Sequence, residues 1–110
     1  MKVLDWKINV EGLKLADHLM GKSVQELTVE VIKGAILSYF SQTGGAKEEQ
    51  RRLYYKLYDE IEAQAKEKTD VLTLEDDRMG LIRKAFRDGG AVPDKLFRLV
   101  DEKVAEVKDR

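Results

Sequence analysis

The stretch LDWKINVEG, residues 4–12, alternates apolar and polar side chains along the start of the chain. A period of two predicts a β-strand that buries one of its faces. Gly12 interrupts the alternation, and leucines resume it at positions 13 and 15. Because glycine accepts the positive φ that tight turns require, we expect a β-hairpin over residues 1–16 that turns near residues 10–12.

A helix start follows the predicted hairpin. Ser23, with Glu26 three residues later, has the form of a capping box and predicts a helix over residues 24–41. The run at 27–32 is rich in β-branched residues and is also compatible with a strand, but the cap and the length favour a helix. The expected apolar face recurs at intervals of three and four and contains Val24, Leu27, Val31, Ile32, Ala35, Ile36, Tyr39 and Phe40.

Three more helices are predicted, over residues 46–68, 74–88 and 93–108. The first is the longest and the most polar, and its apolar stripe contains Leu53, Tyr54, Leu57, Tyr58, Ile61 and Ala65. Thr73 is suited to cap the second, which begins with acidic residues and ends with basic ones, the order that the helix dipole favours. Pro93 is suited to the first turn of the last helix.

These elements predict a mostly helical α+β fold, in which an N-terminal β-hairpin precedes a bundle of about four helices. The connections are short and no repeat or long linker is visible, so we expect a single domain over residues 1–110. A lone hairpin leaves both edges unpaired. A third strand from residues 28–32 or 71–74, or the hairpin of a second copy, could cover them.

A symmetric homodimer is the assembly that we expect, formed through the strand edge or through the apolar seams of the helices. Trp6, Ile8 and Val10 share the apolar face of the first strand and are the interface candidates. For Trp6 the expected role is a core anchor, since it is the largest apolar side chain of the chain, and it becomes an interface residue only if it is exposed.

Composition excludes several classes of protein. The chain has 110 residues, no cysteine, one histidine and a net charge of −1, with 20 basic and 21 acidic side chains. Disulfides, thiolate nucleophiles and cysteine-based metal sites are therefore excluded. No stretch is long and apolar enough for a membrane helix, and no signal-peptide core is visible, so we expect a cytoplasmic protein.

Three short motifs resemble reactive or metal sites, and each has a simpler explanation. Gly21-Lys22-Ser23 matches only the end of a phosphate-binding loop, because Ala16 stands where that loop needs a glycine. His18 could act as a lone base beside an aspartate, but a surface histidine is the expectation. The acids at 75–77 could hold a cation through oxygen ligands, yet helix capping already explains them. We predict no catalytic residue, no metal site and no cofactor.

Basic and aromatic residues are interleaved over residues 51–58 of the helix predicted at 46–68, a composition that can contact phosphates and stack on bases. The candidate nucleic-acid contacts are Lys47, Arg51, Arg52, Tyr55 and Lys56. Acidic residues interleave with them and no segment is strongly basic, so nucleic-acid binding is the alternative hypothesis. The last two helices also permit a helix-turn-helix interpretation, but the acidic residues of the second would repel DNA.

The sequence therefore predicts a non-catalytic protein that works by interaction or assembly, such as a small adaptor, a regulator or a bacterial or phage accessory factor. Its partner is expected to be another protein or a second copy of itself. Capped apolar helices without convergent reactive residues are the basis for this prediction.

Overall fold

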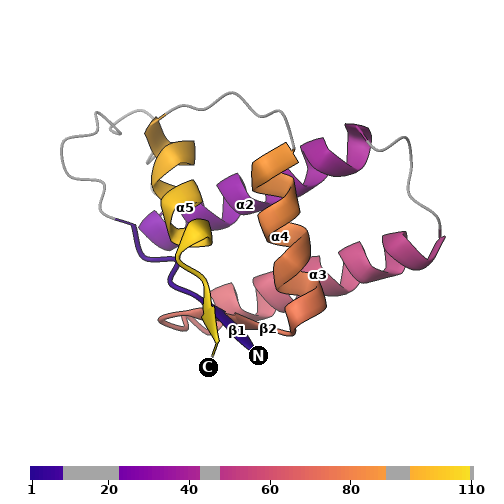
Figure 1. The fold of residues 1–110 in the computed structure, drawn as a ribbon. Helices are drawn as coiled ribbons and strands as arrows, with labels where there is room; N and C mark the ends of the chain where they lie inside the picture. The colour runs from indigo at the N-terminus through magenta and orange to yellow at the C-terminus, as the bar shows by residue number, and fades with distance from the viewer. Residues whose placement is uncertain (9–22, 43–47, 89–94, 110) are drawn as a thin grey trace.

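The computed structural model describes residues 1–8, 23–42, 48–88 and 95–109. These residues form a mostly helical α+β fold, with a small antiparallel sheet beside four helices (Figure 1). In chain order the elements are β1 (Lys2–Leu4), α2 (Val24–Gln42), α3 (Glu48–Lys66), β2 (Leu72–Leu74), α4 (Asp76–Asp88), α5 (Lys95–Ala105) and β3 (Lys108–Asp109).

The sheet is not an N-terminal hairpin, and the prediction of a hairpin is corrected here. The strand order is β2-β1-β3, so β1 is the central strand and pairs antiparallel with two strands from later in the chain. Lys2 faces Leu74 on one side and Asp109 on the other. The turn and second arm predicted at 10–16 lie outside the described residues. Alternating side chains reveal that a segment is extended with one buried side, but they do not reveal which strand pairs with it.

The helical interpretation of residues 27–32 is confirmed, because α2 runs through them without a break. The Ser23 hydroxyl accepts a hydrogen bond from the Glu26 backbone N–H at 3.2 Å, as the predicted cap requires. Thr28, one of the β-branched residues, donates its hydroxyl hydrogen to the Val24 carbonyl at 3.0 Å. Its buried polar group is therefore satisfied within the helix.

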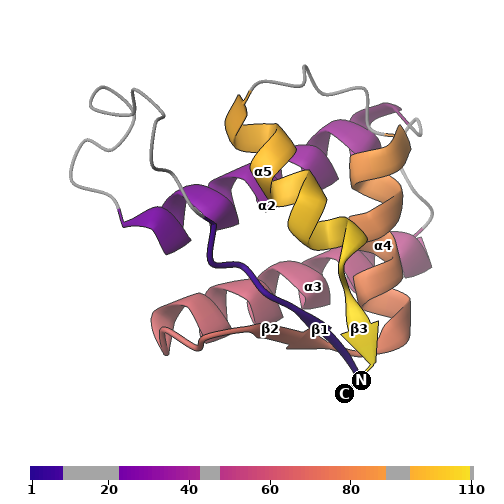
Figure 2. The ribbon, with the colours of Figure 1, turned by 60° about the vertical axis from the view of Figure 1, so that its left-hand side comes forward.

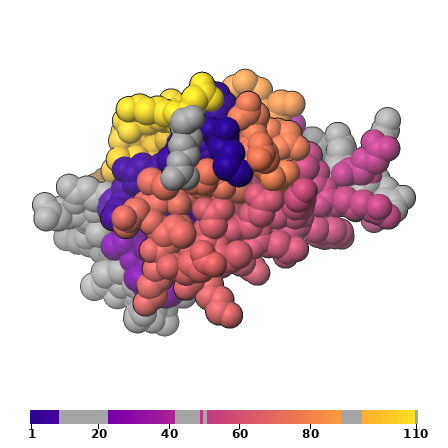
Figure 3. Space-filling model, turned by 90° about the horizontal axis from the view of Figure 1, so that it is seen from below, coloured from indigo at the N-terminus to yellow at the C-terminus, as the bar shows by residue number. Residues whose placement is uncertain are grey.

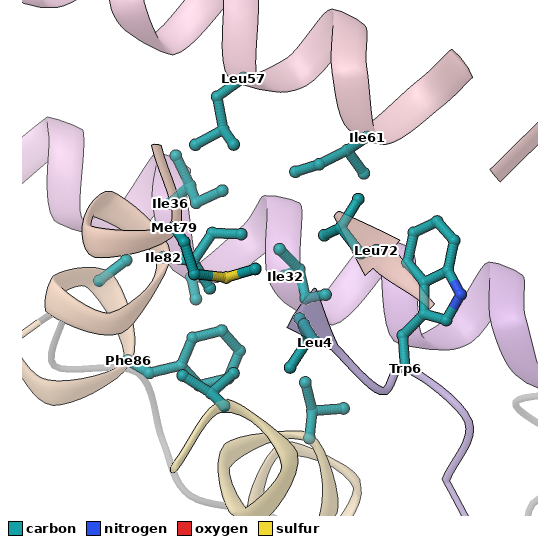
Figure 4. Packing of buried hydrophobic residues seen from close by; sticks show 14 of the residues in the cluster. Leu4, Trp6, Ile32, Ile36, Leu57, Ile61, Leu72, Met79, Ile82 and Phe86 are labelled. Carbon is teal, nitrogen blue, oxygen red and sulfur yellow. The ribbon is translucent and has the colours of Figure 1, made fainter. Parts of the chain in front are cut away.

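α2 packs against all three other helices, and it runs beside α3 in the opposite direction (Figures 1 and 2). Side chains from both helices meet those of β1, β2 and α4 in one hydrophobic core, which Figure 4 shows. Trp6, in the extended segment after β1, is completely buried there. Its indole Nε1–H donates to the Thr69 carbonyl at 2.8 Å. The early residues thus bury one face, as their alternation predicts, but within the helical core.

The turn between α3 and β2 is held by several local hydrogen bonds. The Thr69 N–H donates to the Gln64 carbonyl and the Lys68 N–H to the Ala65 carbonyl, a Schellman arrangement that closes α3. Lys68 takes the left-handed conformation, with φ of 55°, where glycine is usual. The Thr69 carbonyl also accepts a bond from the Gln25 side chain at 2.9 Å. This turn therefore joins α2, α3 and the segment around Trp6.

β2 lies within residues 71–74, one of the two candidate segments for a third strand, and its outer edge is covered by a side chain. The Gln64 amide donates to the Thr73 carbonyl at 2.8 Å and accepts from the Thr73 N–H at 2.9 Å. Thr73 is consequently part of β2 and does not cap a helix, and α4 begins at Asp76 rather than at 74. The opposite edge, β3, has two residues, and Asp109 there pairs with Lys2. Both edges are thus poor templates for another strand.

Candidate functional site

An apolar groove lies between the C-terminal half of α2 and the N-terminal half of α3. Its volume is about 160 Å³, and it is lined by Leu37, Phe40, Arg51, Tyr54, Tyr55 and Tyr58. A buried cavity of about 150 Å³ holds one benzene-sized group. The groove therefore has room for one apolar side chain of a partner.

The floor of the groove is aromatic and well packed. The rings of Phe40 and Tyr54 meet edge to face, with centroids 4.9 Å apart and an angle of 85° between their planes. Tyr58 donates its hydroxyl hydrogen to the Lys33 carbonyl at 3.4 Å. Burial raises the pKa of both Tyr54 and Tyr58, so both hydroxyls stay neutral over the ordinary pH range. The floor thus offers rings and neutral hydroxyl groups.

Two exposed apolar side chains stand on the walls of the groove. Leu37 on α2 is 59 % exposed and Tyr55 on α3 is 63 % exposed. Among the described residues, Met1 is the other large apolar side chain that is exposed to this extent. Isolated exposed leucines are ordinary, but two such residues flanking an aromatic groove form a continuous patch. Figure 3 shows that the N-terminal half of α3 extends away from the part of the molecule that carries the sheet.

Arg51 is the charged residue among those that line the groove. Its side chain is exposed, and no ion pair joins it to another residue in the described part of the chain. A guanidinium beside tyrosine rings can bind a carboxylate and stack on an aromatic partner. The groove therefore combines tyrosine and arginine, which are enriched at the energetic centres of protein interfaces.

The candidate nucleic-acid contacts are partly brought together. Arg51, Arg52, Tyr55 and Lys56 are all exposed on α3, whereas Lys47 lies outside the described residues. Of these, Arg51 and Tyr55 line the groove. The acidic Glu49, Asp59 and Glu62 are also exposed on α3, as the sequence analysis anticipated for a face of mixed charge. The positive potential of this helix is therefore diluted.

The residues expected at an interface lie mostly inside the molecule. Trp6 is fully buried and Ile8 is 8 % exposed, while Val10 lies outside the described residues. Their role at an interface stays a prediction, and in this arrangement Trp6 and Ile8 contribute to the core. The groove, by contrast, is open at the surface and has exposed walls.

The other sequence motifs fall on helix starts or outside the described residues. His18, Gly21 and Lys22 lie in the part that is not described, and Ser23 caps α2. The acids at 75–77 lie at the start of α4, where the Asp77 carboxylate accepts from the Arg78 N–H at 2.8 Å. Across residues 1–8, 23–42, 48–88 and 95–109, no three histidine or acidic side chains converge as a metal site would require.

A second depression, of about 170 Å³, lies beside the sheet and has mixed charge. It is lined by Val3, Asp5, Lys103, Glu106 and Lys108. Lys103 Nζ lies 3.5 Å from an Asp5 carboxylate oxygen, so these opposite charges already face each other. Its walls carry no aromatic ring, unlike those of the groove.

A partly buried ion pair links α3 with α4 away from both depressions. The Arg78 Nε lies 2.8 Å from a Glu60 carboxylate oxygen, but its N–H is not aligned for a hydrogen bond, so Nε is buried without one. We regard the contact as an ion pair, since the short distance fixes the charges whatever the angle. It joins two helices and lines neither depression, so we assign it to the fold.

Comparisons of this chain with protein-family models, with curated proteins and with solved structures find no match. None of the helices in the described ranges is both long enough and apolar enough to cross a membrane.

No pattern in the sequence predicts the groove, because its two walls are far apart in the chain. The predicted apolar stripe of the first helix ends with Tyr39 and Phe40 and omits Leu37, which lies off that stripe. Tyr55 likewise lies off the stripe of the second helix. An apolar residue that departs from the buried face is the signal that could have found this site, since such residues must remain exposed or meet a partner.

Proposed function

We propose that this protein acts without catalysis, by binding another protein chain in the groove between α2 and α3. The observation that carries the proposal is the pair of exposed apolar side chains, Leu37 and Tyr55, on either side of a floor made by Phe40 and Tyr54. A partner side chain placed there would cover all four residues at once.

The energetic basis is burial of apolar surface. Covering an exposed leucine or aromatic side chain contributes roughly 1.5 to 3 kcal/mol, before the costs of association are subtracted. The floor rings are already packed against each other, so little ordering is needed when a ligand arrives. Arg51 at the rim favours a partner that places a carboxylate beside its apolar anchor. The groove thus supports recognition of an apolar residue that is accompanied by an acidic one.

Nucleic-acid binding is the second candidate, supported by the exposure of Arg51, Arg52, Tyr55 and Lys56 on one helix. Phosphate contacts weaken as salt concentration rises. Binding of a labelled single-stranded oligonucleotide, measured at low and at physiological salt, tests this candidate. Salt-sensitive binding that Lys56→Asp reduces would favour it, and absence of binding at low salt would reject it.

Site-specific photo-crosslinking in native host cells tests the proposed function. A photoreactive amino acid is introduced at Leu37 or at Tyr55, and at the exposed Glu102 of α5 as a matched control. We expect protein adducts of defined mass from the two groove positions and none above background from the control. Equal labelling at all three positions, or no adduct from the groove, would show that the groove is not a protein-binding site.

A further inference from the structure

One face of α3 carries a charge pattern that is complementary to itself. Arg51, Tyr55 and Asp59 follow one another at intervals of four residues, so they form one row along the helix. All three side chains are exposed. Within the described ranges, neither Arg51 nor Asp59 has an ion-pair partner. Glu62, near the same row, is already paired with Lys33 of α2.

This row pairs with its own copy in one orientation. If two α3 helices lie antiparallel about a two-fold axis at Tyr55, each Arg51 stands opposite Asp59 of the partner subunit, and the exchange occurs twice. A parallel arrangement would instead place like charges against each other. Two-fold contacts are self-complementary by symmetry, so a single row supplies both halves of the interface.

We propose that the occupant of the groove is a second copy of this chain, bound through antiparallel α3 helices. Tyr55 of each copy enters the groove of the other and contacts Leu37 and Phe40 there, while Arg51 pairs with the partner's Asp59. This inference rests on the proposed function, because it names the partner of the same groove. The groove volume of about 160 Å³ suits one aromatic ring.

This face of α3 is a better surface for self-association than the sheet edges, because both edges are covered or short. Gln64 covers the outer edge of β2, and β3 is short and carries a charged pair at its end. A contact made by one helix and one groove is at the small end of stable interfaces. We therefore expect dimers at micromolar concentration, in exchange with monomers.

Sedimentation equilibrium of the purified chain over a range from low micromolar to millimolar concentration tests the inference. We expect a monomer–dimer equilibrium for the parent protein. Arg51→Asp and Asp59→Arg should each weaken it by at least about tenfold, since each variant sets like charges opposite each other twice. When the two variants are mixed, opposite charges meet again at every position, and we expect a heterodimer with affinity close to that of the parent.

Lys56→Asp is the matched control, because it is the same reversal of an exposed charge on the same helix but off the row. It should leave the dimer unchanged, and circular dichroism should show every variant folded. A parent chain that remains monomeric at all concentrations, or a mixture of variants that does not associate, would overturn the inference. Adducts of a different protein at Tyr55, with a monomeric parent, would overturn self-association and leave the proposed function intact.

Discussion

The two ends of the α2–α3 pair contain the same kinds of residue in opposite environments. Toward the sheet, Ile32 of α2 and Ile61 of α3 are fully buried in the core that also contains Trp6 and Leu72 (Figure 4). At the other end, Leu37 and Tyr55 are more than half exposed beside an open groove. The difference in exposure arises because β1, β2 and α4 pack against the first end, whereas the described residues leave the second end open. One end of the pair is packed into the core, and the other is open to solvent.

Trp6→Ala should have the largest effect, because it leaves a cavity in the core at the end of the α2–α3 pair that lies toward the sheet. Removing a fully buried aromatic side chain costs about 3 to 5 kcal/mol of unfolding free energy. The variant also loses the hydrogen bond to the Thr69 carbonyl. Urea unfolding followed by circular dichroism measures the change, since fluorescence of the single tryptophan is lost. Trp6→Phe is the control that retains most of the volume, and it should lose less.

Ile36→Ala and Leu37→Ala are adjacent truncations that compare burial with exposure on one helix. Ile36 is fully buried and its truncation should cost about 2 to 5 kcal/mol. Leu37 is exposed in the single chain, and at concentrations where the protein is monomeric its truncation should change the unfolding free energy by less than about 0.5 kcal/mol. Both values come from urea unfolding under the same conditions. Similar losses for the two variants would mean that Leu37 is covered, either by this chain or by a second copy in a dimer.

A concentration series separates those two outcomes. If Leu37 is covered by a second copy, the loss caused by Leu37→Ala should grow with protein concentration, because dimer formation adds to stability by mass action. If it is covered within one chain, the loss should be independent of concentration. In the second case Leu37 would be buried in the single chain, and the two ends of the helix pair would not differ in exposure.

Gln64→Ala should have an intermediate effect by uncovering the edge of β2. The side chain makes two hydrogen bonds to the Thr73 backbone, and both Thr73 groups would lose their partner. Leaving partly buried polar groups without partners costs about 1 to 3 kcal/mol. An exposed strand edge also favours aggregation. Unfolding measurements give the first effect, and light scattering at rising concentration gives the second, with Gln25→Ala as an amide control away from the edge.

Local signals in the sequence predict the helices but not the partners of the strands. The Ser23 cap and the spacing of apolar residues are short-range features, and they place the helical start of α2 correctly. β1 pairs with residues more than sixty positions away, and a two-residue strand such as β3 has no pattern to detect. Lys68 ends α3 in the left-handed conformation, where glycine is usual, so the residue type at this position does not predict the end of the helix.

In the candidate site, too, one part can be predicted from local sequence and the other depends on contacts between distant segments. Arg51 and Tyr55 are neighbours along one helix, and their composition alone singles them out as a contact surface. Leu37 and Phe40 join them only because α2 and α3 run antiparallel, which brings residues 37–40 beside residues 51–58. The chemistry of one wall is therefore readable from the sequence, while the groove itself depends on tertiary packing.

Loss of the surface ion pair between Lys2 and Asp109 in the sheet should have the smallest effect on the free energy of unfolding. Lys2 of β1 donates to the carboxylate of Asp109 in β3, and this bond lowers the pKa of Asp109 below its ordinary value. A lowered pKa means that the pair adds stability when the carboxylate is ionised, and that this contribution is lost as pH falls through the pKa of the folded state. Both groups are near solvent, so the change in stability should be slight.

Lys2→Met should therefore act on the titration rather than on the fold. We expect the pKa of Asp109, followed by NMR, to rise toward its ordinary value when Lys2 is replaced. Asp70 is the internal control, because its lowered pKa depends on a hydrogen bond from Lys7 and should not move. If Asp109 titrates identically in both proteins, the pairing of β1 with β3 at Lys2 and Asp109 does not persist in solution, and the edge that β3 covers would be open to another strand.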